Sequence, residues 1–250
     1  MPPWHNLVLR QIANLVSARI SRFKSGRWRQ KEDKMKTVVM SVGGSLINPG
    51  QIQIEFLKKL KSFVEKSPHK FIIVCGGGYS ARAYITASKE FGVKPIGWDE
   101  IGIKATVLNA ELLRHIFKAP PALQKPTKTN FKKVLIAAGW LPGCSTDYDA
   151  VLWAKKFNVK EVFNLSNTDY VYTKDPKLFT DAKPLKKLSW KEYKKTITQK
   201  WVAGLNTPFD PVASKAAEKA KMKVICINGQ KLKELDKYLK GKKFTGTVIG

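Results

Sequence analysis

The stretch KFIIVCGGGYSARAYI, residues Lys70–Ile85, decides the fold. An apolar run typical of a buried strand leads into three consecutive glycines, and the residues after them follow a helical pattern. Glycines in such a strand-to-helix turn let backbone N–H groups face an anion, and Arg82 follows one turn into the helix. The stretch predicts an α/β unit with a phosphate-binding turn. A glycine turn without a ligand and a solvated arginine are the competing interpretation.

The same alternation of strand and helix continues on both sides of this stretch. Strands are predicted at 36–42, 70–75, 132–138, 161–166, 223–227 and 244–249. Helices are predicted at 53–66, 79–91 and 99–118, from 147, near 190, from 210, and after 227. In the long helix, the expected buried stripe is Ile101, Ala105, Leu108, Leu112 and Ile116. Short loops between these elements predict an α/β fold with an open, mostly parallel sheet and helices on both faces.

Composition narrows the classes of protein. A chain of 250 residues with 43% hydrophobic residues can build one large core, and no run reaches the ~18 apolar residues of a membrane span. Three scattered cysteines (Cys75, Cys144 and Cys226) suggest reduced thiols and a cytoplasmic protein rather than a metal cluster. The net charge of +27 invites a nucleic-acid interpretation. Because the lysines are spread over helix faces without interleaved aromatic residues, we expect no specific nucleic-acid binding.

Residues 1–34 differ in kind from the rest of the chain. They hold five of the seven arginines, and apolar residues at helical spacing between Leu9 and Phe23 predict a basic amphipathic helix. Such a helix could lie on a membrane, bind RNA or act as a targeting segment. We expect instead a dispensable extension, or a stretch that is not translated if Met35 is the true start. Residues 35–250 then form the functional domain.

Four loops follow strands that end at one edge of the expected sheet: 42–45, 75–82, 138–147 and 164–176. Ligands of open α/β sheets bind at the carboxyl ends of the strands. Three of the loops combine glycine with Ser or Thr and lead to a helix N-terminus, which suits several phosphates. The loops match neither the Walker A pattern nor the dinucleotide-binding pattern. Together they favour phosphate chemistry.

These segments resemble the amino acid kinase superfamily, and specifically its archaeal-type uridylate (UMP) kinases. The resemblance rests on SVGGSLI, CGGGYSARAYI, DEIGIKATVLNAELL, PGCSTDYDAV, NLSNTDYVYTKDPK, DAKPLKKLS, DPVASKAAEKAK and GTVI, which occur in family order over about residues 36–249. It implies a three-layer αβα sandwich and transfer of the γ-phosphoryl group of ATP to UMP. It also implies Mg²⁺ as cofactor, ATP and UMP as partners, and usually a homohexamer.

The resemblance also implies roles for individual residues. The catalytic set would be Lys215, which stabilises the transferring phosphoryl group, Arg82, and Asp147, which orients such cations. ATP would be held by Gly43, Gly44, Ser45, Gly78, Arg82, Asn167, Tyr172 and Asp175. UMP would be held by Gly77, Asp99 and the loop of Trp140, Leu141, Pro142, Gly143, Cys144, Ser145 and Thr146. From the sequence alone, Asp147 could equally be the N-cap of the next helix, and Lys215 is one lysine among many.

The chemistry agrees with these roles. An acceptor phosphate is already ionised, so the reaction needs no general base, and the histidines lie outside the four loops. It needs cancellation of the repulsion between two anionic nucleotides, which a forked arginine provides better than lysine. Ser41–Val42 replaces the lysine that many family members have there, which places more weight on Arg82 and Lys215. The bulky Trp140–Leu141 pair and the added carboxylate of Asp149 leave the base specificity open. The alternatives are isopentenyl phosphate kinase, an amino-acid kinase, or a nucleotide- or RNA-binding regulator.

Overall fold

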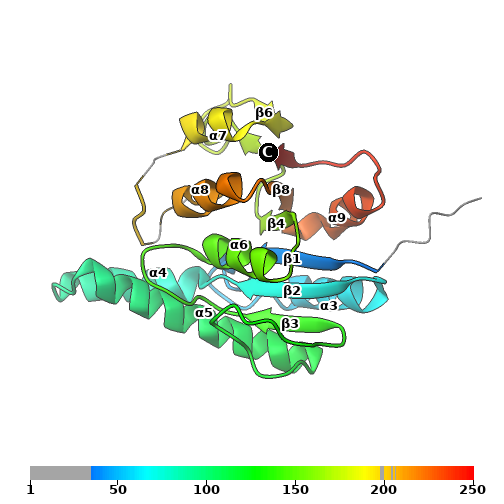
Figure 1. The fold of residues 1–250 in the computed structure, drawn as a ribbon. Coiled ribbons are helices and arrows are strands. Elements are labelled where there is room, and N and C mark those ends of the chain that lie inside the picture. The colour runs from blue at the N-terminus through cyan, green and yellow to red at the C-terminus, as the bar shows by residue number, and fades with distance from the viewer. Residues whose placement is uncertain (1–34, 198–199, 204, 206) are drawn as a thin grey trace, which may run out of the picture. The chain divides into compact units, whose positions relative to one another are not determined.

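The computed structural model describes residues 35–197, 200–203, 205 and 207–250 (Figure 1). The predicted basic helix of residues 1–34 lies outside this part, so its role stays a prediction. Within the described residues, no helix is long and apolar enough to cross a membrane.

A seven-stranded sheet forms the centre of the domain. Its order is β3 (Val134–Ala137), β2 (Lys70–Cys75), β1 (Thr37–Val42), β4 (Glu161–Ser166), β8 (Lys223–Asn228), β9 (Thr247–Ile249) and β7 (Lys187–Leu188). The first five strands are parallel, with Val39 opposite both Ile72 and Val162, and β9 runs antiparallel to β8. A separate antiparallel pair joins β5 (Val171–Tyr172) to β6 (Pro184–Leu185). The prediction of an open, mostly parallel sheet is confirmed.

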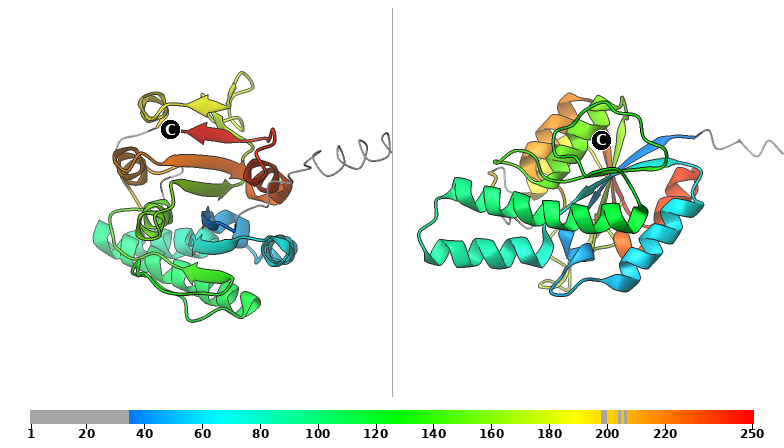
Figure 2. Two further views of the ribbon diagram at one scale, coloured as in Figure 1. Left: turned by 45° about the vertical axis from the view of Figure 1, so that its right-hand side comes forward. Right: turned by 90° about the horizontal axis from the view of Figure 1, so that it is seen from below.

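Helices cover both faces of the sheet, as Figure 2 shows for α6 and α8 on one side and α3 and α9 on the other. The helices are α2 (Gly44–Ile47), α3 (Ile54–Lys66), α4 (Gly78–Glu90), α5 (Pro95–Phe117), α6 (Thr146–Lys156), α7 (Trp190–Thr196), α8 (Pro211–Lys219) and α9 (Leu232–Leu239), with a 3₁₀ turn at Gly229–Lys231. Side chains alternate along β1: Val38 and Met40 join the core under α3, α5 and α9, whereas Val39 joins the core under α6 and α8. Two cores on one sheet make the three-layer αβα sandwich.

The long helix α5 differs from its prediction in two ways. It begins at Pro95 rather than Asp99, because proline fits the first helical position, where its missing N–H is not needed. Its buried residues are Thr106, Asn109, Ala110 and Leu113. The predicted stripe is wrong at Leu108, which is 65% exposed, whereas Leu112 and Ile116 are partly buried and pack against the core as expected. The buried face of α5 includes two polar residues, Thr106 and Asn109, so a search for apolar spacing alone does not find it.

Candidate active site

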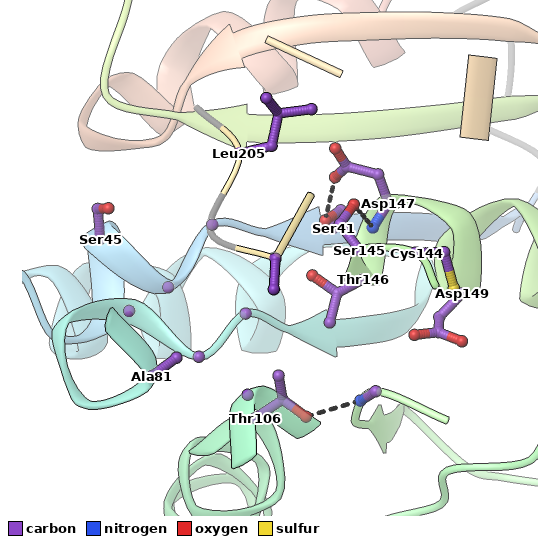
Figure 3. Close-up of a pocket in the computed structure, with 18 of the residues that line it drawn as sticks. Ser41, Ser45, Ala81, Thr106, Cys144, Ser145, Thr146, Asp147, Asp149 and Leu205 are labelled. Carbon is purple, nitrogen blue, oxygen red and sulfur yellow. Dashed lines mark hydrogen bonds between the residues drawn. The ribbon is translucent and has the colours of Figure 1, made fainter. Parts of the chain in front are cut away.

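The carboxyl ends of β1, β2, β3 and β4 surround one cavity of about 510 Å³, shown in part in Figure 3. All four loops singled out in the sequence contribute to its wall. The polar or glycine lining residues that they supply are Gly43, Gly44, Ser45, Gly76, Gly77, Gly78, Arg82, Gly139, Cys144, Ser145, Thr146, Asp147, Asn164, Ser166 and Asn167, and Ser41 at the end of β1 also lines the cavity. This volume lies within the usual range of small-molecule sites, about 300–1,000 Å³.

The glycine turns after β1 and β2 pack against each other, backbone on backbone. A Cβ on Gly44 would lie 1.9 Å from the Gly78 nitrogen, and one on Gly76 would lie 2.4 Å from the Gly44 nitrogen. Gly78 has φ of +67°, which favours glycine, and its Cβ would meet the Gly44 carbonyl oxygen at 2.5 Å. The sequence analysis assigned these glycines to the approach of phosphates. The structure gives them a further role, since only glycine lets the two turns meet.

Arg82 joins the two glycine turns at one end of the cavity. It lies in the second turn of α4, and its Nη1 donates to Ser45 Oγ over 3.4 Å. Arg82 is an exposed residue of the cavity wall. Figure 3 places Ser45 and Ala81 at this end, away from Asp147 and Asp149. The geometry therefore brings the predicted arginine beside the predicted Gly43–Ser45 turn.

Helix α5 fixes the second and third loops from below. Asn109 donates to the Gly76 carbonyl oxygen at 2.7 Å, and Thr106 Oγ1 accepts from the Gly139 N–H at 2.8 Å (Figure 3). Both side chains are buried, and these bonds explain why polar residues occupy the buried face of α5. Sequence reasoning missed both residues, because their helical spacing was not accompanied by apolar character.

Asp99 connects α5 to the loop after β3. One carboxylate oxygen accepts from the Gly143 N–H at 2.7 Å, and the other accepts from Trp201 Nε1 at 3.4 Å. Asp99 and Trp201 both line the cavity. The predicted acceptor carboxylate and the predicted acceptor-phosphate loop are thus adjacent. Trp201 was not anticipated, because nothing in its local sequence marks it.

Asp147 lies at the other end of the cavity within a set of polar partners. Its Oδ1 accepts from Ser41 Oγ at 2.8 Å and from Asn164 Nδ2 at 3.5 Å, and its Oδ2 accepts from the Asp210 N–H at 3.3 Å. Ser145, not Asp147, caps α6, since its Oγ accepts from the Asp147 N–H. The alternative interpretation of Asp147 as a plain N-cap is therefore wrong.

Asp210 holds the start of α8 against the same cluster. Its Oδ1 accepts from the N–H groups of Val212 and Ala213, and its Oδ2 accepts from Ser145 Oγ at 2.5 Å. The Asp-Pro pair before a helix could have identified this N-cap in the sequence. Burial, and then repulsion from Asp210, raises the pKa of Asp147 to about 7. Burial likewise raises the pKa of Asp210.

Several predicted residues lie away from the cavity wall. Of the expected acceptor loop, Leu141, Cys144, Ser145 and Thr146 line the cavity, whereas Trp140, Pro142 and Gly143 do not. Of the expected ATP residues outside the glycine turns, Asn167 lines it and Tyr172 and Asp175 do not. Lys215 is exposed on α8 and does not line the cavity. The roles assigned to these residues stay predictions.

The described residues contain no group of three or more His, Cys, Asp or Glu side chains that could hold a metal ion. Mg²⁺ prefers oxygen ligands, and the phosphates of a bound nucleotide would supply them.

The fold, with its loops gathered at one cavity, defines an α/β protein of the kinase type. The chain belongs to the amino acid kinase family, whose sequence profile matches residues 36–228. It is 34% identical to the uridylate kinase of Sulfurisphaera tokodaii over 223 residues, which are 85% of this chain and 98% of that protein. It is also 34% identical to the uridylate kinase of Archaeoglobus fulgidus, with 85% and 99% covered.

Solved structures agree with these relatives. The crystal structure of the Archaeoglobus fulgidus uridylate kinase superposes with a TM-score of 0.67 at 32% identity, covering 86% of this chain and all of that one. The UMP kinase from Ureaplasma parvum gives a TM-score of 0.69 at 18% identity, with 87% and 99% covered, and supports the fold alone.

Proposed function

We propose that the protein is a UMP kinase that transfers the γ-phosphoryl group of ATP to UMP, giving UDP and ADP, in pyrimidine nucleotide biosynthesis. The observation that carries this proposal is the meeting of all four predicted loops at one cavity. The uridylate kinases named above share this chain's sequence over nearly their whole length, which favours UMP as the acceptor.

The donor would lie against the glycine turns. We assign Gly43, Gly44, Ser45 and the N-terminus of α4 at Gly78 to the phosphates of ATP. The N–H groups of Gly44, Ser45 and Gly78 would face the phosphates, whereas the Gly43 N–H donates to the Leu165 carbonyl oxygen at 2.9 Å and holds the turn in place. Arg82 can fork onto two phosphate oxygens from its place beside Ser45. Asn167 borders the same cavity, and we assign Tyr172 and Asp175 to the outer part of the ATP site.

The acceptor would lie against the third loop. We assign Gly77, Asp99 and the loop from Trp140 to Thr146 to UMP, with the N-terminus of α6 facing its phosphate. Asp99 can accept from a sugar hydroxyl in addition to its bonds with the Gly143 N–H and Trp201. The ends of α4 and α6 therefore direct two phosphate groups into one cavity.

Transfer between these groups requires positioning and charge cancellation rather than a general base. The described histidines, His69 and His115, do not line the cavity. Arg82 and Lys215 would stabilise the charge of the transferring group, with Lys215 reaching over from α8, and Asp147 would orient such cations. Mg²⁺ bound with ATP neutralises charge on the β- and γ-phosphates.

The assembly and location are part of the proposal. We propose a homohexamer in the cytoplasm, without a specific nucleic-acid partner. Four exposed apolar side chains on or beside α4 and α5, which are Tyr84, Phe91, Ile96 and Leu108, support a subunit contact. The three free cysteines are consistent with a reducing compartment.

An ADP-release assay with matched acceptors tests the proposal. We expect kcat/KM for UMP to exceed that for CMP or AMP at least ~10-fold, which corresponds to about 1.4 kcal/mol. Equal values for the three nucleotides, or turnover of isopentenyl phosphate alone, would reject a UMP kinase.

A further inference from the structure

Asp149 is a buried carboxyl of the site, and only one of its two oxygens has a hydrogen-bond partner among the described residues. It lies in the first turns of α6, lines the cavity and is only 2% exposed. Its Oδ2 accepts from the Trp140 N–H at 3.3 Å, whereas its Oδ1 is buried and has no hydrogen-bond partner among the described residues. An ionised carboxylate oxygen buried without a partner is costly, so this geometry favours the neutral acid.

The charges around the cavity also favour the neutral acid form of Asp149. Among its described lining residues, three carboxylates (Asp99, Asp147 and Asp149) stand against one guanidinium, that of Arg82. Arg82 contacts Ser45, at the opposite end of the cavity from Asp149 (Figure 3). A phosphate at the N-terminus of α6 would therefore meet carboxylates first, which is unfavourable unless some of them are neutral.

The elements packed against α6 bring little compensating charge to Asp149. β1 has no titratable side chain, and Lys70 and Glu161 begin β2 and β4 at the far end of the sheet. β2 ends in the buried thiol of Cys75.

The remaining neighbours of Asp149 are mostly acidic. From α8 come Asp210 at its N-cap and the exposed Lys215. Asp147 precedes Asp149 on α6 itself, and the Cys144 thiol lies in the same loop.

We propose that Asp149 is a positioning residue for the acceptor, acting as the protonated acid: Oδ1 carries the proton while Oδ2 holds the Trp140 N–H at the start of the acceptor-phosphate loop. The neutral acid keeps this loop in place without repelling the phosphate bound beside it. The proposal rests on the UMP kinase function proposed above.

The burial of Asp149 and its acidic neighbours also determine the pH range in which its carboxyl titrates. Burial, opposed by the bond from the Trp140 N–H, raises the pKa of Asp149 to about 7, and repulsion from Asp210 and Asp147 adds to the rise. Near neutral pH, the carboxyl is therefore divided between its two forms. A bound phosphate dianion favours the protonated form, so UMP binding takes up a proton above pH 7.

Two variants separate the bond to Trp140 from the charge. Asp149→Asn keeps an oxygen that can accept from the Trp140 N–H and stays neutral at every pH, whereas Asp149→Ala loses the bond as well. We expect KM for UMP to rise about 10-fold from pH 6.5 to 8.5 in the natural protein, with a smaller change in kcat. The Asn variant should keep a low KM throughout, and the Ala variant should have a raised KM at every pH.

Asp236→Asn, at a half-exposed position of α9, is the matched control and should follow the natural protein. The second ionisation of UMP itself is common to all variants, so it cancels from their ratios. Identical pH profiles of the Asn variant and the natural protein, or equal KM values for the Asn and Ala variants, would overturn the inference.

Calorimetry of the natural protein provides a test that no variant's folding can compromise. UMP binding at pH 8 in two buffers of different ionisation enthalpy should show uptake of up to about one proton beyond that of UMP. No such uptake would overturn the role of Asp149. Failure of the natural protein to phosphorylate UMP would instead overturn the proposed function.

Discussion

Gly44→Ala tests whether the two glycine turns must touch. The new Cβ would lie 1.9 Å from the Gly78 nitrogen and 2.5 Å from the Gly78 Cα. Because ordinary contacts are about 3.5 Å, the turns would have to separate by roughly 1.5 Å. All the atoms involved belong to the backbone, so no side-chain rotation can relieve the contact.

Two consequences follow for the Gly44→Ala variant. Overpacking of this kind costs about 3 kcal/mol, which lowers Tm by ~6–12 °C in a domain of this size. The separated turns would also misplace both phosphate-binding backbones, and a displacement of about 1 Å costs ~10²-fold in rate. Thermal melting and the ADP-release assay measure the two effects on the same preparation.

Gly50→Ala is the matched control, because a Cβ at Gly50 meets no atom within 4 Å. This variant should keep both the Tm and the kcat of the natural protein. If Gly44→Ala were equally silent, the close packing of the turns and the reason given for their glycines would be refuted.

Four further changes test other parts of the site. Arg82→Lys should lower kcat ~10²-fold, about 2.7 kcal/mol, with a smaller change in KM for UMP. Arg114→Lys on α5 is the control and should have almost no effect. Equal rates for the two variants would show that Arg82 is only a solvated helix residue without a role in transfer. Lys215→Ala should reduce kcat by at least as much with Tm unchanged, since an exposed helical lysine carries little stability, and an unchanged kcat would remove Lys215 from the mechanism. A chain that starts at Met35 should match the full chain in yield and turnover, and loss of either would show that residues 1–34 belong to the functional unit. Asp149→Asn should raise Tm at pH 8 but not at pH 4, because a carboxyl whose pKa is raised to about 7 on folding loses stability as pH rises from 4 through 7; an equal effect at both pH values would refute this titration.

Local patterns in the sequence predicted the sheet well. The strands at Thr37–Val42, Lys70–Cys75 and Glu161–Ser166 are mostly apolar runs, as buried parallel strands require, and each leads to a loop that lines the cavity. Because parallel strands end at one edge, the convergence of their loops could be derived before any coordinates were known.

What the sequence did not reveal depends on contacts between distant segments. Thr106 and Asn109 look like interruptions of an apolar stripe, and only the fold shows that they hold the backbone of Gly139 and Gly76. Trp201 reaches Asp99 across 102 positions of the chain. The contact of Trp201 with Asp99 could not be predicted from the spacing of residues in the sequence.

The glycines of the two turns illustrate a second limit of prediction from the sequence. Their presence after β1 and β2 predicts phosphate binding, and that role stays a prediction. Their steric reason was hidden, because it lies in the contact of one turn with the other. Residue type alone cannot separate a glycine needed by a ligand from one needed by a neighbouring backbone.

The most direct test of the central claim follows the phosphoryl group itself. Phosphorus NMR of the natural protein with ATP, Mg²⁺ and UMP should show the γ-phosphate signal of ATP decline as UDP and ADP appear in equal amounts, with no inorganic phosphate. Release of inorganic phosphate in place of UDP, or no change in ATP when UMP is present, would contradict direct transfer to UMP.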